Sequence, residues 1–414
     1  MNPNPTLTST PAQQGRRNLW VLAVFSFLRG AHNSIYTVIW QPFVLSLGAS
    51  MPTLGLLNSL GGLNGVVTTL VQPLGGWFAD RLGHKPFIIV SGFAILAAYG
   101  LFALAGGLDI WSLLLIGVIF FGISAISRPA FSAMTAESVA VEQRGRAFGL
   151  IVMAAMIPGV FMPILSGWTA DRFGYLNVFA LMLALEVLGL FLIWRYLREM
   201  RRIQDKGITW RTGTFAFFRS FIPPKGLVGF FCAVAGDSLF WGMGWGILYG
   251  MLNKNYHFTI MQLAIMQCVM SLTWVVSQIP IGRYIDKHGS KGMLIFSEAL
   301  GIPLMLVWMS TTRFEIFVFS QILFGLTAST WVPTVNTFLT HQVSDNERAE
   351  AFSRLNTFRG VIACFGPAIG GFLYKWGGIR APLIANLIGI FIVIAVLIFF
   401  VHEPKKDSRL QIQD

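Results

Sequence analysis

Seven ionisable side chains stand inside long apolar stretches of this sequence. They are three arginines, three carboxylic acids and one histidine, namely Arg29, Arg128, Arg359, Glu186, Asp237, Glu298 and His32. A fixed charge at the centre of a membrane helix costs about 2.5–3.5 kcal/mol on insertion scales. These side chains are therefore expected to face one another or a wet cavity. The chemistry open to them is ion pairing, proton binding and recognition of a polar substrate.

The elements that carry these residues are twelve apolar stretches, each close to the roughly 20 residues that a membrane helix needs. The chain has 414 residues, of which 55% are hydrophobic and 12% are charged, about half the charged share of a soluble domain. The runs are continuous rather than alternating, which favours helices over strands. The predicted spans are 18–46, 53–79, 86–106, 111–138, 146–170, 176–197, 226–250, 259–282, 291–311, 315–341, 354–373 and 380–402.

The distribution of lysine and arginine predicts the orientation of these spans. If the N-terminus is cytoplasmic, 22 of the 30 basic residues lie in cytoplasmic segments, five lie outside and three lie within spans. We therefore expect a multi-pass protein of the cell membrane with both termini in the cytoplasm. This asymmetry also accounts for the net charge of +12 without a nucleic-acid partner.

The longest polar connector divides the chain into two halves of six spans. The predicted organisation is a disordered cytoplasmic tail, a six-helix bundle, a cytoplasmic linker, a second six-helix bundle and a second tail, over residues 1–17, 18–197, 198–225, 226–402 and 403–414. The charged linker is interpreted as a solvated connector, with contact to anionic lipid as the alternative.

A Gly-rich, charge-bearing loop recurs four times at corresponding places between spans. It predicts four three-helix units in which neighbouring units run in opposite directions, the inverted-repeat organisation of one class of transporters. The copies are Gly76-x-x-x-Asp80-Arg81-x-Gly83-His84-Lys85, Gly167-x-x-x-Asp171-Arg172-x-Gly174, Gly282-x-x-x-Asp286-Lys287-x-Gly289-x-Lys291 and the weaker Gly371 to Gly378.

On this loop, its position and its second-half copy, the chain resembles the major facilitator superfamily over residues 16–404, with His84 where the family often has arginine. The resemblance implies an all-α membrane fold of two six-helix bundles and a loop that acts as a conformational gate. Asp80 is then expected near Arg354 and Asp286 near Arg146, where a helix N-terminus favours a carboxylate; a simple turn or cap role is the alternative. The candidate gate residues are Gly76, Asp80, Arg81, Gly83, Lys85, Asp286, Lys287, Gly289 and Arg359. Gly83 and Gly289 are expected to have positive φ.

A second family feature is mixed. Residues 366–371 in the eleventh span look like the antiporter-type motif, which in the family belongs to the fifth span. Here the fifth span has Met162 to Gly167 and lacks two of the glycines. The alternative interpretation is that these small residues, like Gly242, Gly246 and Gly250, permit close helix packing.

In this family the first, fourth, seventh and tenth helices line the central cavity, which implies that Arg29 and Asp237 meet there. Both stand 11 residues into their spans. They are interpreted as a substrate or proton site, or as a structural ion pair between the halves. Arg29, His32, Asn33 and Tyr36 share one helical face, expected to be the cavity wall, although His32 could instead be bonded within its own helix. The candidates for substrate or proton binding are Arg29, His32, Asn33, Tyr36, Arg128, Asp237, Trp241 and Trp331. Arg128 could also sit at the cytoplasmic mouth, and the tryptophans could be ordinary packing residues.

The predicted function is secondary active transport by alternating access, with proton-coupled export of a small amphipathic compound that is neutral or anionic. The sequence has no G-x-x-x-x-G-K-[ST] motif for nucleotide binding. The alternatives are uptake of an organic acid or sugar, flipping of a lipid headgroup, and a non-transporting receptor or scaffold. Three scattered cysteines and six scattered histidines suggest neither a metal site nor an enzyme. We expect the protein to bind no cofactor and to be a monomer.

Overall fold

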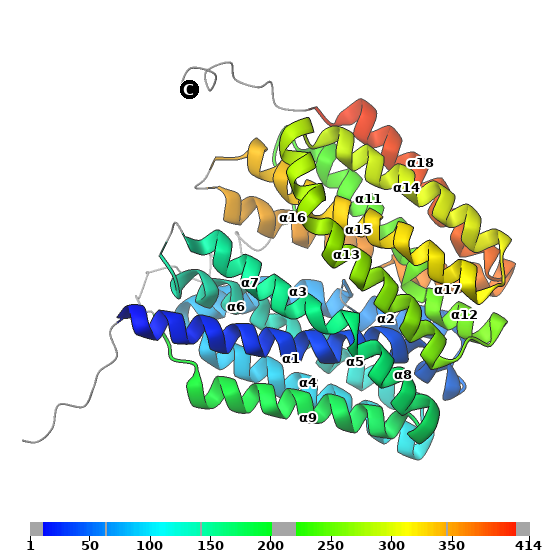
Figure 1. Ribbon diagram of the computed structural model, residues 1–414, viewed down its shortest axis with the longest axis horizontal. Coiled ribbons are helices and arrows are strands. Elements are labelled where there is room, and N and C mark those ends of the chain that lie inside the picture. Colours follow the sequence, from blue (N-terminus) through cyan, green and yellow to red (C-terminus); the bar gives the residue numbers. More distant parts are fainter. Residues whose placement is uncertain (1–10, 63, 141–142, 201–220, 345–346, 403–414) are drawn as a thin grey trace, which may run out of the picture.

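The computed structural model of the protein describes residues 11–62, 64–140, 143–200, 221–344 and 347–402 (Figure 1). The regular elements in these ranges are all helices, and they make the twelve predicted spans. Eleven spans have the length and hydropathy of membrane-crossing helices, and the first, of 36 residues, carries several of the polar side chains discussed below.

The N-terminal half forms one six-span bundle. Its second, fourth and fifth spans are each interrupted near the middle, where glycine, serine or proline residues weaken the α-helix. The helices are α1 (Pro11–Ser46), α2 (Met51–Gly61), α3 (Val66–Leu82), α4 (Lys85–Leu108), α5 (Leu113–Ile123), α6 (Ser127–Glu137), α7 (Arg144–Met156), α8 (Met162–Phe173) and α9 (Tyr175–Tyr196), with 3-10 turns η1 (Ser124–Ile126) and η3 (Ile157–Val160).

The C-terminal half forms the second six-span bundle. Here the seventh and eleventh spans are interrupted, the latter before Gly366 and Pro367. The elements are α11 (Val228–Gly244), η4 (Trp245–Ile247), α12 (Leu248–Tyr256), α13 (Ile260–His288), α14 (Lys291–Ser310), α15 (Phe314–Gln342), α16 (Arg348–Ala363), α17 (Gly366–Gly377) and α18 (Arg380–Phe400).

The first helix begins earlier than predicted. It starts at Pro11, so residues 11–17, expected in a disordered tail, are helical. Asn18 is buried and fastens this end of α1, since its amide nitrogen donates to the Arg198 carbonyl (2.7 Å) and its amide oxygen accepts from the Arg198 N–H (3.1 Å). Residues 1–10, 201–220 and 403–414, which include most of the predicted tails and linker, lie outside the described residues.

The repeated loop has the same backbone form at all four places. Each copy ends its helix with a glycine in the left-handed range of φ, as predicted for Gly83 and Gly289. The φ angles are 93° at Gly83, 82° at Gly174, 87° at Gly289 and 65° at Gly378. The fold therefore carries the repeat that the sequence pattern indicated.

Lysine side chains extend this likeness between the two halves. Lys85 begins the third span and its Nζ donates to the carbonyls of Trp194 (2.9 Å) and Leu197 (2.7 Å), where α9 ends. Lys291 begins the ninth span, and its Nζ donates to the Ile398 carbonyl (3.0 Å), where α18 ends. A cation at a helix C-terminus satisfies carbonyls that have no helical partner. Each half thus ties its third span to its sixth in the same way.

The two bundles meet mainly at the end of the molecule opposite the chain termini. There α2 packs on α17, α8 on α13 and α1 on α12 (Figure 1). Gly55 lies over the Pro367 backbone and Gly371 over Met51 and Pro52, so closely that a Cβ at either glycine would overlap the neighbouring chain. Nearer the termini, α3 contacts α16. We call the first region the far end and the other the terminal end.

Candidate functional site

A cavity of about 280 Å³ lies between the two bundles. It is lined by α1 and α2 from the first bundle and by α11, η4, α12, α16 and α17 from the second. Its wall combines aromatic and polar side chains, a composition typical of sites for small molecules. The lining includes Tyr36, Trp40, Gln41, Asn58, Asp237, Ser238, Trp241, Trp245 and Tyr249.

An interrupted helix forms part of this wall, and the opposite bundle completes it. The break at η4 leaves the Gly246 carbonyl free to accept from Gln41 Nε2 (3.1 Å) and Asn58 Nδ2 (3.0 Å). The Gln41 side chain also accepts from the Gly250 N–H (2.8 Å). Backbone groups in a membrane must be satisfied within the protein or by cavity water. Amides of the first bundle therefore satisfy the broken helix of the second.

Asp237 lies in the cavity wall beside a second carboxylic acid. Asp237 on α11 and Glu298 on α14 are buried and lie side by side, with Trp331 and Trp241 next to the pair. The Ser238 hydroxyl lies 3.4 Å from Asp237 Oδ2. Two neighbouring buried carboxyl groups repel each other when both are ionised, so this pair is suited to hold a proton. The sequence analysis did not predict this pairing.

The predicted pairing of Arg29 with Asp237 is wrong. Arg29 points into the first bundle, where its Nη2 lies 3.2 Å from Glu186 Oε1 and donates to Ser91 (2.7 Å), and its Nη1 donates to Ser127 (3.3 Å). Glu186 has an exposed side-chain fraction of only 1%. A neighbouring carboxylate in its own bundle neutralises Arg29 without crossing the interface. Asp237 has Glu298 and Arg359 as its charged neighbours instead.

His32 belongs to the same network and is not bonded within its own helix. Its Nε2 is 2.9 Å from Glu186 Oε2, and its Nδ1 is 2.8 Å from the Tyr99 hydroxyl. The expected common cavity face of α1 is therefore only partly correct. Tyr36 lines the cavity, Asn33 is exposed, and Arg29 and His32 turn towards α4 and α9. Of the two tryptophans singled out, Trp241 lines the cavity and Trp331 contacts Asp237.

Arg128 in the first bundle and Arg359 in the second lie within electrostatic range of each other. Arg128 is exposed at the start of α6, and both Arg29 and Arg359 lie within electrostatic range of it. Arg359 on α16 donates from Nη2 to Asn356 (3.1 Å), while its buried Nε has no partner. Asp237 lies within electrostatic range of Arg359.

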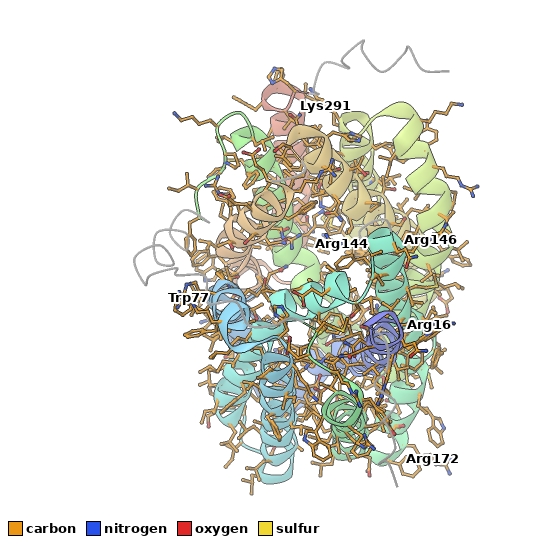
Figure 2. All side chains as sticks on the ribbon, turned by 90° about the vertical axis from the view of Figure 1, so that its left-hand side faces the viewer. Arg16, Trp77, Arg144, Arg146, Arg172 and Lys291 are labelled. Atoms are coloured by element: carbon orange, nitrogen blue, oxygen red, sulfur yellow. The ribbon has the colours of Figure 1, made fainter. Side chains whose placement is uncertain are left out.

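The gate loops are described only in part. The side chains of Asp80 and Asp286, the two central gate candidates, lie outside the described residues. Gly76 packs near Pro129, the Arg81 guanidinium lies 3.7 Å from the Trp77 ring centroid, and Lys287 is exposed. Arg354, the expected neighbour of Asp80, makes an ion pair with Glu350 (3.2 Å). Figure 2 looks onto this end and labels Trp77 and the basic residues Arg16, Arg144, Arg146 and Lys291.

A third loop copy makes the type of contact that was expected of Asp80 and Asp286. Asp171 Oδ2 accepts a hydrogen bond from the Met261 N–H (3.1 Å) in the first turn of α13. The contact joins the two bundles at the far end and places a carboxylate at a helix N-terminus, where it is favoured. The sequence signal was the repeat itself, which aligns Asp171 with Asp80 and Asp286.

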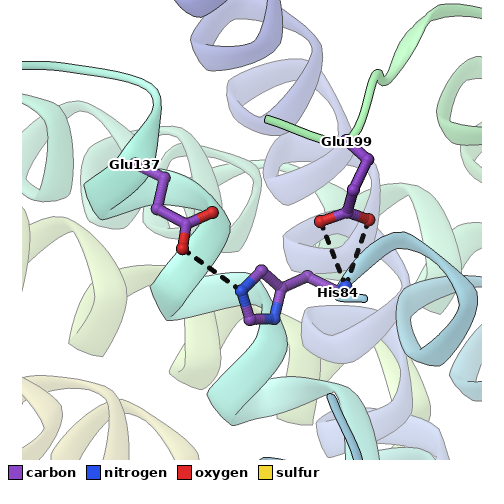
Figure 3. A group of neighbouring side chains, drawn as sticks. All are labelled: His84, Glu137 and Glu199. Carbon is purple, nitrogen blue, oxygen red and sulfur yellow. Dashed lines mark hydrogen bonds and ion pairs between the residues drawn. The ribbon is translucent and has the colours of Figure 1, made fainter. Parts of the chain in front are cut away.

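His84 occupies a buried polar cluster behind the first loop. Its Nε2 lies 3.4 Å from Glu137 Oε1, and the Glu199 carboxylate accepts from the backbone N–H of His84 (3.1 Å) (Figure 3). The same carboxylate also accepts from the Lys85 N–H (3.0 Å). One ligand-type atom from each of the three side chains lies within 4.8 Å of the others. Glu199 thus caps α4 from the beginning of the connector, and sequence reasoning missed it.

The small residues singled out in the seventh and eleventh spans serve close packing. Gly242 lies against Gly366, Gly246 against Pro367, and Gly370 against the Met243 backbone. A side chain at Gly366 or Gly370 would overlap α11. This agrees with the packing interpretation of residues 366–371 and of the seventh-span glycines.

Comparison with known proteins agrees with this architecture. The family model described as Major Facilitator Superfamily matches residues 22–241 and 227–414. The chain is 25% identical over 405 residues to a protein of Yersinia enterocolitica named multidrug resistance protein MdtG, covering 95% of this chain and 94% of that one. It is 22% identical to the multi-drug resistance efflux pump PmrA homolog of Lactococcus lactis, covering 99% and 100%.

Solved structures share the fold at lower identity. A D-xylose–proton symporter superposes with a TM-score of 0.73 at 14% identity, covering 94% of this chain and 98% of that one. The two six-span bundles, the repeated loop and a family match that spans nearly the whole chain lead to one assignment. The chain belongs to the major facilitator superfamily.

Proposed function

We propose that this protein is a proton-coupled secondary transporter that exports a small amphipathic compound, neutral or anionic, by alternating access. The observation that carries the proposal is the buried carboxyl pair Asp237–Glu298 in the wall of the cavity between the bundles. A site that holds a proton beside a substrate cavity has the arrangement that coupling needs. The curated relatives named as multidrug efflux proteins support export over uptake of an organic acid or sugar.

The coupling we propose depends on charge at Asp237. With a proton shared between Asp237 and Glu298, the pair carries one negative charge. Loss of that proton adds a second negative charge to the pair. The pair then attracts Arg359 on α16 more strongly, because a buried carboxylate without a partner is unfavourable. The protonated and deprotonated proteins therefore favour different arrangements of α11, α14 and α16. A ligand shifts a conformational equilibrium only through such a difference between states.

The distribution of basic residues supports a cytoplasmic position for the terminal end. With both termini in the cytoplasm of a cell-membrane protein, the contacts at the far end correspond to a state closed to the outside. Arg128, exposed between the bundles, then faces a vestibule open to the cytoplasm. We propose that a monomer works in this way, alternating with a state in which the far-end contacts are broken.

The test is compound-dependent proton movement in proteoliposomes with a trapped pH dye. Wild type is compared with Asp237→Asn, Glu298→Gln and the control Glu315→Gln, which changes an exposed carboxylate on α15. Pools of amphipathic anions, neutral compounds and cations are added, and both the internal pH and the compound are followed. We expect a compound-dependent proton flux in wild type and control, and its loss in both carboxyl variants. Compound transport at an equal rate in Asp237→Asn, without proton flux, would contradict proton coupling through this pair.

A further inference from the structure

One of the three arginines within the spans, Arg128, has no carboxylate beside it among the described residues. Arg29 is paired with Glu186, which also contacts His32. Arg359 has Asp237 within electrostatic range, and Asp237 lies beside Glu298. Within the described part of the chain, Arg128 makes neither a hydrogen bond nor an ion pair, and its charged neighbours are two further arginines. A positive charge held among like charges at membrane depth is unfavourable unless an anion joins it.

Arg128 and Arg359 are carried by helices that pack on the same face of α3, about two turns apart. Arg128 directly precedes Pro129, which packs on Gly76 of α3, and Arg359 directly precedes Gly360, which packs on Thr69 of the same helix. Ser127, the neighbour of Arg128, accepts a hydrogen bond from Arg29. Each guanidinium is therefore carried by a helix whose position is fixed by close contact with α3.

Arg359 lies next to the aromatic cavity, on the side of the terminal end. Ala363 and Cys364 line the cavity, and Ala363 follows Arg359 by one helical turn on the same face of α16. Because α16 runs from the terminal end inwards, Arg359 is on the vestibule side of the cavity. The wall beyond it is formed by Tyr36, Trp40, Trp241 and Trp245. A compound that enters from the terminal end would therefore pass Arg359 before it reaches the aromatic side chains of the cavity.

We propose that Arg128 and Arg359 form a subsite for the anionic head of the transported compound, whose apolar body lies in the aromatic cavity. The ligand class is an amphipathic organic anion with a carboxylate, phosphate or phosphonate group. A guanidinium presents paired N–H donors that match such a group, and the unpartnered Nε of Arg359 supplies a free donor. The inference rests on the proposed function for the cavity and specifies the substrate class.

The test is equilibrium binding to the purified full chain in a neutral detergent, with no proton gradient. Three probes share one aromatic body: 1-naphthoate, 1-naphthylmethanol and 1-naphthylmethylamine. Quenching of tryptophan fluorescence reports occupancy of the aromatic cavity. We expect wild type to bind the carboxylate about tenfold more tightly than the alcohol, the range of a charge-assisted contact, and the amine more weakly still. Arg128→Gln and Arg359→Gln should each remove most of this preference and leave affinity for the alcohol unchanged.

Two further variants make the result specific. Arg128→Lys keeps the charge and should retain part of the preference, whereas Arg313→Gln, at an exposed site before α15, should bind like wild type. Equal affinity of wild type for the carboxylate and the alcohol would overturn the proposal. The proposal would also be overturned if Arg128→Gln lost affinity for the carboxylate and the alcohol equally, because that would indicate general damage to the cavity. If added phosphatidylglycerol, but not naphthoate, showed Arg128-dependent binding, the site would be one for a lipid headgroup and the proposal would fail.

This experiment can fail independently of the proposed function. Binding of naphthoate that depends on both arginines, without proton flux in proteoliposomes, would support the anion subsite and contradict proton coupling. Proton-coupled transport of a neutral compound or a cation, unaffected in Arg128→Gln, would support the proposed transport and overturn the subsite.

Discussion

The Glu186 carboxylate on α9 serves two side chains of α1 at once. Its Oε1 lies 3.2 Å from Arg29 Nη2 and its Oε2 lies 2.9 Å from His32 Nε2. The glutamate and histidine side chains are each only 1% exposed, and Tyr99 on α4 holds the other nitrogen of His32. Three spans of the first bundle are thus joined through one buried carboxylate.

Removing this charge should destabilise the first bundle. In Glu186→Gln, Arg29 loses its counter-ion and His32 loses its carboxylate partner, and breaking a buried pair from one side costs about 3–5 kcal/mol. We expect a lower midpoint of thermal unfolding in detergent, measured by tryptophan fluorescence. Glu315→Gln, at an exposed carboxylate, should change the midpoint little. Equal stability of Glu186→Gln and wild type would show that the network contributes no net free energy.

The contact between Asp171 and Met261 should favour the state closed at the far end. Asp171→Ala removes a carboxylate that caps α13 across the interface, a type of contact that contributes about 1 kcal/mol. We therefore expect a roughly fivefold shift towards opening at the far end. The measurement is the rate at which an impermeant maleimide labels Asn64→Cys, in the cavity wall, from that side. Thr169→Ala, which removes a hydroxyl bonded only to its own helix, should label at the parental rate, and equal rates in all three proteins would refute this role.

Fixing the far end shut should stop transport. The pair Asp171→Cys/Met261→Cys, in a chain whose three native cysteines are replaced by alanine, joins α8 to α13 when cross-linked. We expect cross-linking to abolish transport in proteoliposomes and reduction to restore it, because the bundles could no longer separate there. Asn255→Cys/Tyr374→Cys is the matched control, since those side chains touch within the second bundle (3.1 Å). Undiminished transport after complete cross-linking of the first pair would argue against alternating access.

Glu199 should stabilise the first loop, although the two are more than 100 residues apart in sequence. Glu199→Ala leaves the N–H groups of His84 (Figure 3) and Lys85 without their acceptor. Loss of a helix cap costs about 0.5–2 kcal/mol, and we expect a correspondingly lower unfolding midpoint. Glu347→Ala, an exposed residue that accepts from Ser344, is the comparison. A midpoint as high as that of wild type would mean that water replaces the cap.

The spans, the loop repeat and the fold of two six-helix bundles could be predicted from the sequence, because each depends on local features. Apolar length defines a span, and Gly83 and Gly289 are glycines in a turn that other residues rarely adopt. The chain supplied no comparable local signal for its ion pairs. Arg29 and Asp237 stand at equal depth in their spans, yet depth does not specify the direction in which a side chain points.

The partners of the buried charges depend on helix rotation and on neighbours far away in sequence. Glu186 is 157 residues from Arg29, and its face of α9 is hydrophobic on both sides, so no pattern marks it. Glu298 comes close to Asp237 because Gly301, one turn further along α14, admits the Trp241 ring and lets α11 approach. The helix breaks were equally hidden, because the glycines and prolines that mark them also occur in unbroken spans such as α15.

The interrupted seventh span carries a consequence for the kinetics of the transport cycle. Its Gly246 carbonyl and Gly250 N–H are satisfied by Gln41 and Asn58 of the opposite bundle, so separation at the far end strips three hydrogen bonds from the backbone. Each group left without a partner costs about 1–3 kcal/mol until water reaches it. Hydration of one peptide segment would then limit the turnover rate, and the rate should slow in heavy water and in viscous, water-poor media even when the substrate is saturating.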